Sequence, residues 1–151
     1  LDDMLFNVRM AGFVPILTHP ERLRWIENNY AVIVDLAHNG VWMQITAGSL
    51  TGRFGRRPHY WSHRMLAEGL ISLLATDAHN TRSRPPLLKE AFSIAEAELG
   101  YEEAVNLVVN RPAHILDSAP AEEAPSRPAI QVVAPAAPEP FWRRLFIGGS
   151  A

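Results

Sequence analysis

The sequence predicts an α/β fold built on parallel strands, and three observations support this. Residues 13–18, 41–46 and 70–76 form short, nearly continuous apolar runs, as expected of strands covered by helices. These runs start about 28–30 residues apart, which is the length of one strand–helix unit. Helical segments separate them, so right-handed crossovers should place the strands side by side. Three strands cannot close a barrel, so we expect a parallel sheet or a segment of a barrel.

Boundary residues support the alternation of strands and helices. Gly40 and Gly69 follow the first two helical segments, and Pro58 begins the second of them. Proline at a helix start and glycine just beyond a helix end are common boundary residues. The chain also opens with a helical pattern. The other segments predicted to be helical are 30–38, 58–68, 86–99 and 102–109, with a final turn from Pro112.

The composition changes after residue 117. Residues 118–140 are rich in alanine, proline and glutamate, which predicts a disordered linker rather than a packed segment. Residues 141–151 begin with an aromatic and basic cluster of a kind that docks on a partner or a membrane surface. A frayed tail with no docking role is the alternative. We therefore expect a folded part at 1–117, a linker at 118–140 and a tail at 141–151.

The composition also excludes several classes of function. The 151 residues contain no cysteine, which rules out a disulfide framework and a thiolate nucleophile. The net charge is -2, whereas a protein that coats nucleic acid needs a basic face, so we expect no nucleic-acid partner. If the protein cleaves phosphate esters, it must use a metal-activated water or another nucleophile. The histidines and carboxylates are therefore the candidate residues.

Polar side chains follow each predicted strand. His19 follows the first, and Asp77 and His79 follow the third. In parallel α/β folds such strand ends meet at one edge, where ligands bind. A carboxylate and imidazoles together suit a divalent metal such as manganese, iron or zinc. The alternative is that Asp77 caps a turn and His79 lies on a surface loop.

Two arginines lie just beyond these candidate ligands. Arg22 and Arg84 carry guanidinium groups that match the oxygens of a phosphoryl group. The alternative is an ordinary ion pair, for instance with Glu21 or with an acidic residue of a helix. Residue types alone do not separate these two interpretations.

Three motifs resemble a known family. Residues 18–22 (THPER), 44–55 (QITAGSLTGRFG) and 77–80 (DAHN), with Arg-Pro-Pro at 84–86, resemble the bacterial protein-tyrosine phosphatases of capsule and exopolysaccharide operons. That family belongs to the polymerase-and-histidinol-phosphatase (PHP) superfamily. The resemblance extends over about residues 10–117, and the ordered combination of motifs is more specific than Asp-x-His alone.

The resemblance implies the fold, the metal and the ligands. The superfamily fold is a distorted (β/α)7 TIM-like barrel, of which this chain would be the C-terminal part. His19, Asp77 and His79 would be metal ligands. The cofactor would be a cluster of divalent ions, in this family usually manganese.

The resemblance also implies a substrate and a place of action. Arg22, Arg84 and Asn80 would hold the phosphate of the substrate, and the two arginines would take part in catalysis. The substrate would be phosphotyrosine on the C-terminal tail of a membrane tyrosine kinase that is also a polysaccharide co-polymerase. The protein would be cytoplasmic, with peripheral contact to the inner membrane through its tail.

One departure from the family pattern limits this expectation. The family opens with His-x-His and adds acidic ligands, whereas only Asp2 and Asp3 precede His19 as acids. Because three ligands do not hold a multinuclear cluster against water, we expect an upstream part of the gene product to supply the others. The 151 residues alone should then show negligible turnover. Another PHP phosphoesterase and a non-catalytic module that docks on the kinase or the membrane are the rival interpretations.

Overall fold

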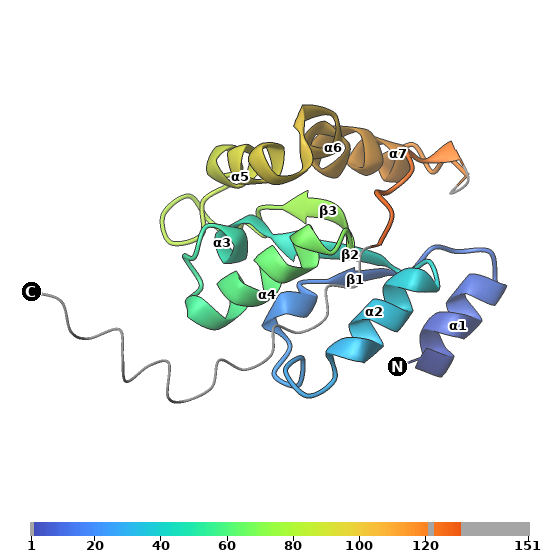
Figure 1. Ribbon diagram of the computed structural model, residues 1–151. Helices are drawn as coiled ribbons and strands as arrows, with labels where there is room; N and C mark the ends of the chain where they lie inside the picture. Colours follow the sequence, from blue (N-terminus) through green and yellow to red (C-terminus); the bar gives the residue numbers. More distant parts are fainter. Residues whose placement is uncertain (1, 121–122, 131–151) are drawn as a thin grey trace, which may run out of the picture.

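The computed structural model describes residues 2–120 and 123–130. Three strands alternate with helices along this part of the chain (Figure 1). The elements are α1 (Asp2–Met10), β1 (Ile16–Thr18), the 3-10 turn η1 (Pro20–Arg22), α2 (Tyr30–His38), β2 (Trp42–Thr46), α3 (Ala47–Leu50), α4 (Arg56–Ala67), β3 (Ile71–Ala75), α5 (Lys89–Leu99), α6 (Tyr101–Val105), the π-helical turn η2 (Asn106–Asn110) and α7 (Arg111–Leu116).

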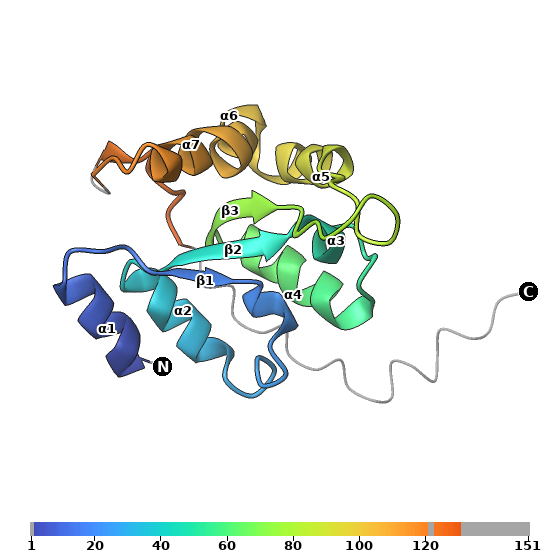
Figure 2. The ribbon, with the colours of Figure 1, turned by 180° about the vertical axis from the view of Figure 1, so that it is seen from behind.

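The strands form one parallel sheet in the order β1-β2-β3, which confirms the predicted α/β class. Ile16 pairs with Trp42, and Thr46 pairs with Ala75. Helices α5, α6 and α7 lie on the β3 side of the molecule, and α1 lies at the opposite end (Figures 1 and 2). Because all three strands run the same way, the segments that follow them emerge at one edge of the sheet.

Some predicted boundaries were wrong. The first strand begins at Ile16, not at residue 13, since Pro15 has no N–H to donate and Phe13 is 68% exposed. The helix predicted from residue 86 begins at Lys89, because Pro85 and Pro86 hold the preceding segment extended. The short helix α3 was not predicted, since its four residues carry no periodic pattern.

The core lies around the sheet and the faces of the helices turned toward it. Helix α4 contributes one face with period 3.6, and α5 contributes the buried Ala91 and Ala95 together with the partly buried Phe92 and Ile94. Burial of these apolar groups is the main favourable term in folding. The fully buried apolar side chains include Ile26, Ile33, Met43, Ile45, Leu50, Met65, Leu66, Leu70, Ala95 and Leu107.

A buried polar cluster joins α2 to α4. Tyr30 Oη donates a 2.7 Å hydrogen bond to Glu68 Oε2, and Arg64 Nε donates to Glu68 Oε1 at 2.9 Å. The Arg64 guanidinium lies 4.1 Å from the centre of the Tyr30 ring. Burial and the hydrogen bond to Glu68 raise the pKa of Tyr30 well above its usual value of 10.0. The cluster therefore gives both carboxylate oxygens of Glu68 a hydrogen-bond donor inside the protein.

Tyr30→Phe should lower the free energy of unfolding by about 1.5–3 kcal/mol near neutral pH, because it removes a hydrogen bond to a buried carboxylate. The difference between wild type and variant should shrink above about pH 10. There Tyr30 ionises in the unfolded chain but not in the folded one, so the wild type becomes less stable, whereas the variant has no tyrosine to ionise at this position. Urea unfolding at several pH values measures this. Tyr60→Phe, on an exposed side chain of α4, is the matched control and should change little. A loss that stays constant with pH would contradict the explanation.

The segment after α7 returns to the sheet. Arg111, fully buried, donates to the carbonyl oxygens of Pro125 and Ser126 at 3.1 and 2.7 Å. Arg127 donates to the carbonyl oxygen of Ala37 at 3.1 Å, and Ile130 packs against the core. The described part of the predicted linker is thus held on the folded part. The predicted tail at 141–151 lies outside the described residues.

No helix in residues 2–120 or 123–130 combines the length and apolar character needed to cross a membrane.

Candidate functional site

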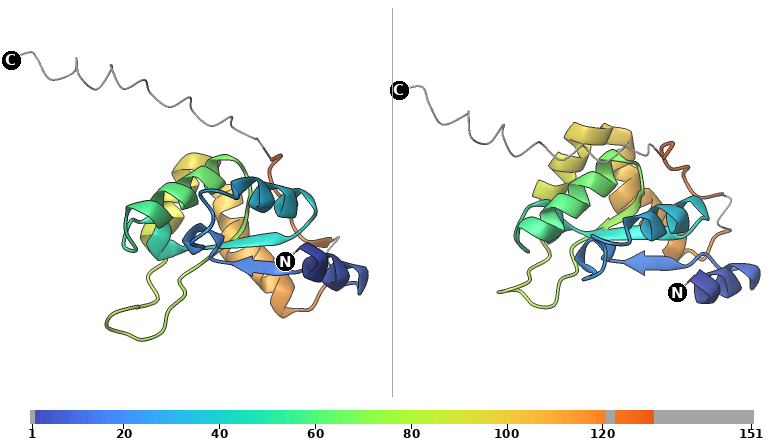
Figure 3. Two further views of the ribbon diagram at one scale, coloured as in Figure 1. Left: turned by 90° about the horizontal axis from the view of Figure 1, so that it is seen from below. Right: turned by 60° about the horizontal axis from the view of Figure 1, so that its bottom comes forward.

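The candidate site lies where β1 and β3 end. His19 follows β1 with a φ of 42°, and Asp77 follows β3 with a φ of 50°. Both are in the left-handed region, which is uncommon for residues other than glycine and often marks a functional turn. Pro20 then begins η1, and a long loop from 76 to 88 projects beyond β3 (Figure 3). The two turns direct polar side chains to the same edge of the sheet.

Asp77 is the centre of the charged cluster. Arg22 Nη1 donates to Asp77 Oδ2 at 2.9 Å, and Arg84 Nη2 binds the same oxygen. His79 Nε2 lies 3.2 Å from Asp77 Oδ1. Burial alone would raise the pKa of Asp77, but the bond to His79 and the charges of Arg84 and Arg22 hold it below its usual value. Two guanidinium groups from different loops thus converge on one oxygen atom.

Asn80 organises the loop that carries Arg84. Its Oδ1 accepts hydrogen bonds from the backbone N–H groups of Arg82 and Ser83 at 2.9 and 2.7 Å, and its Nδ2 donates to Ser83 Oγ. The backbone N–H of His79 also donates to the carbonyl oxygen of Arg84 at 3.1 Å. The loop is therefore closed on itself at its base. Contact of Asn80 with substrate stays a prediction.

The three predicted metal ligands are only partly brought together. The side chains of Asp77 and His79 are in contact. The hydrogen bonds of His19 are made by its backbone: its N–H donates to the Gln44 carbonyl oxygen at 2.7 Å, and its carbonyl oxygen accepts from the N–H of Arg22. Within the described ranges, no three His, Cys, Asp or Glu side chains form a group that could hold a metal ion. The donors suit a divalent metal in kind but fall short in number. The assignment of these ligands stays a prediction.

Glu21 has a different role from that weighed in the sequence. Arg22 does form an ion pair, but its partner is Asp77 and not Glu21. Glu21 is fully buried, and its Oε1 accepts from Ser49 Oγ at 2.7 Å and from Thr46 N at 3.1 Å. Burial raises the pKa of Glu21. This carboxyl group fastens η1 to the segment that follows β2.

Phe54 is a site residue that sequence reasoning missed. The guanidinium carbon of Arg22 lies 5.1 Å from the centre of the Phe54 ring, and that of Arg84 lies 5.6 Å away. These distances are within the range of a cation–π contact. An aromatic residue between Arg53 and Arg56 in a glycine-rich turn was the only signal in the sequence. With Phe54, all three strand-end segments contribute to the cluster.

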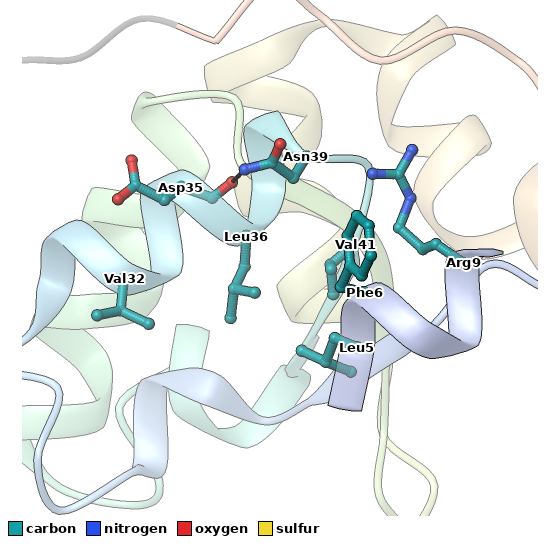
Figure 4. Close-up of a pocket in the computed structure, with 8 residues that line it drawn as sticks. All are labelled: Leu5, Phe6, Arg9, Val32, Asp35, Leu36, Asn39 and Val41. Carbon is teal, nitrogen blue, oxygen red and sulfur yellow. Dashed lines mark hydrogen bonds between the residues drawn. The ribbon is translucent and has the colours of Figure 1, made fainter. Parts of the chain in front are cut away.

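The hollow between α1, α2 and the start of β2 is remote from this cluster (Figure 4). Phe6 and Arg9 of α1 face Asp35 of α2 and its C-cap residue Asn39 across it, and no predicted site residue lines it. Asn39 Nδ2 donates to the Asp35 carbonyl oxygen at 2.8 Å, which closes the end of α2. The candidate site residues therefore lie outside this hollow, at the strand ends.

The chain is similar to proteins of a known family. Residues 1–117 match the family described as "Capsular polysaccharide synthesis, CpsB/CapC". The chain is 36% identical over 101 residues to the tyrosine-protein phosphatase YwqE of Bacillus subtilis, covering 67% of this chain and 40% of YwqE. It is 33% identical over 109 residues to the putative tyrosine-protein phosphatase CapC of Staphylococcus aureus, covering 72% and 43%.

A solved structure supports the same relationship. The chain resembles a structure from the crystallographic work on YwqE of Bacillus subtilis and CpsB of Streptococcus pneumoniae, described as unique metal-dependent tyrosine phosphatases, with a TM-score of 0.78 and 31% identity. The match covers 88% of this chain and 52% of the other. The chain spans about half the length of the relatives it matches or less. It belongs to the CpsB/CapC family of capsular polysaccharide synthesis.

Proposed function

We propose that this chain supplies the phosphate-binding part of a metal-dependent tyrosine-protein phosphatase of capsular polysaccharide synthesis. The observation that carries the proposal is the convergence of Arg22 and Arg84 on one carboxylate oxygen of Asp77. Two guanidinium groups aimed at one oxygen are arranged to bind an oxyanion. The names of the relatives support phosphotyrosine as the substrate class.

The residues of this chain would bind and orient the phosphoryl group. Arg22 and Arg84 would contact its non-bridging oxygens and offset the negative charge that develops during transfer. The closed loop built on Asn80 would keep Arg84 in place. A divalent metal, when bound, would supply an activated water and a Lewis acid.

The finer assignments belong to the same proposal. His19, Asp77 and His79 would be ligands of the metal, which we propose to be manganese, and the sheet would be the C-terminal part of a (β/α)7 barrel of the PHP type. The partner would be the phosphorylated tail of a bacterial tyrosine kinase and polysaccharide co-polymerase. Residues 141–151 would contact the inner membrane from the cytoplasmic side. The parallel sheet and the donor types at its edge support the barrel and metal-ligand assignments.

Calorimetric titration of the 151-residue chain with phosphotyrosine, in the presence of Mn²⁺, tests the proposal. We expect binding, and Arg84→Met should weaken it roughly tenfold or more, since a charge-assisted contact is lost. Arg82→Met, on the exposed part of the same loop, is the matched control and should bind like wild type. Absence of binding to wild type, or equal loss in both variants, would overturn the proposal.

A further inference from the structure

We propose that Phe54 is a positioning residue that holds Arg22 and Arg84 in their convergent arrangement. This inference rests on the proposed function, because it concerns the same phosphate-binding arginines. Phe54 does not need to touch the substrate. Its ring acts through the two guanidinium groups that lie over it, at 5.1 and 5.6 Å from its centre.

The first support is that the three residues come from three different segments, one after each strand. Arg22 follows β1, Phe54 lies between α3 and α4 after β2, and Arg84 lies in the loop after β3. The arginines carry like charges and approach one oxygen of Asp77, so they repel each other. The face of an aromatic ring attracts cations, and one ring that both groups share offsets part of this repulsion.

The second support is the way in which the ring itself is fixed. Phe54 lies directly on Gly48 of α3, where a Cβ atom would be only 2.8 Å from Phe54 Cε2. Phe54 N also donates to the Gly48 carbonyl oxygen at 3.2 Å. The ring therefore lies in contact with a backbone position where a side chain larger than glycine would force it to move.

The third support is the freedom that Arg84 would otherwise have. Arg84 Nε is buried and has no hydrogen-bond acceptor among the residues that the structure describes. Asp77 holds one end of this guanidinium, and the ring provides a second contact. Without the ring, the group would be free to turn about its bond to Asp77. An arginine that must first be ordered binds an anion more weakly.

Phosphate binding and arginine NMR signals together test the inference on the 151-residue chain. Phe54→Leu keeps apolar bulk but removes the aromatic face, and it should weaken binding of inorganic phosphate about 5- to 30-fold, as expected for loss of two cation–π contacts. Phe54→Tyr should retain wild-type affinity. Gly48→Ala should weaken binding in the same direction by displacing the ring, and a thermal melt of each variant confirms that it is folded.

The arginine side-chain signals provide a readout that does not depend on binding. Protons over an aromatic face resonate at higher field, so Arg22 and Arg84 should show high-field side-chain signals in wild type and Phe54→Tyr, and lose them in Phe54→Leu. If Phe54→Leu binds phosphate like wild type, the inference is overturned while the proposed function stands. If wild type binds no phosphate, the proposed function fails, and the arginine signals decide the inference: a shift lost in Phe54→Leu supports it, and no shift overturns it.

Discussion

Replacing Arg111 with methionine should lower the free energy of unfolding by about 3–5 kcal/mol, because it leaves the partner of a buried ion pair without its cation. Arg111 is fully buried and forms a two-pronged pair with Glu103, at 2.8 and 2.9 Å. Its other bonds go to the carbonyl oxygens of Ser72, Pro125 and Ser126. These contacts use all the donors of the guanidinium group, so no other side chain can replace it.

Urea unfolding of Arg111→Met measures the loss. Arg53→Met, which makes the same change at an exposed position, should change stability little. Adding Glu103→Leu to Arg111→Met should restore part of the stability, since it removes the unpaired carboxylate. If Arg111→Met is as stable as Arg53→Met, the buried contacts of Arg111 with Glu103, Pro125 and Ser126 do not stabilise the fold as expected.

Glu21→Ala should lower the free energy of unfolding by about 3 kcal/mol, because it leaves Ser49 Oγ and Thr46 N without their acceptor and opens a cavity. The same change should weaken phosphate binding, since η1 carries Arg22 and would lose its attachment to α3. Thermal unfolding and phosphate titration of the same sample give both effects.

Glu21→Gln separates the hydrogen bonds from the charge. Glutamine keeps an acceptor at the position of Oε1 and removes a charge whose burial raises the pKa of the carboxyl group. We expect Glu21→Gln to retain stability close to wild type and to bind phosphate normally. A loss equal to that of Glu21→Ala would show that the ionised carboxylate, not the acceptor, holds the turn.

Part of the candidate site could be predicted from residue types and spacing. The spacing of Asp77 and His79 after a buried strand indicated that they would lie together, and they do. Arg22 and Arg84 were expected to act at one place, and their contact with Asp77 brings them there. His19, with a left-handed backbone, precedes η1, and the described residues contain no group of three possible metal donors, so its expected place beside the same carboxylate stays a prediction.

Phe54 and Glu21 show why the other contacts of the site could not be predicted from the sequence. An aromatic residue in a basic turn and a glutamate beside an arginine have common surface explanations, and neither carries a periodic pattern. Their roles depend on which atoms of α3 lie next to them, namely the bare Gly48 backbone and Ser49 Oγ. Such contacts follow from packing and not from local propensity.

The sequence by itself determined the parallel α/β order, most helix positions and the presence of charged groups at the strand ends, because apolar runs, proline and glycine act over a few neighbouring residues. Only the tertiary structure decided which of these charges meet. Arg22 binds Asp77 across a separation of 55 positions. Contacts between distant loops depend on strand register, turn conformation and the space that neighbouring side chains leave. A local sequence pattern does not determine these three together.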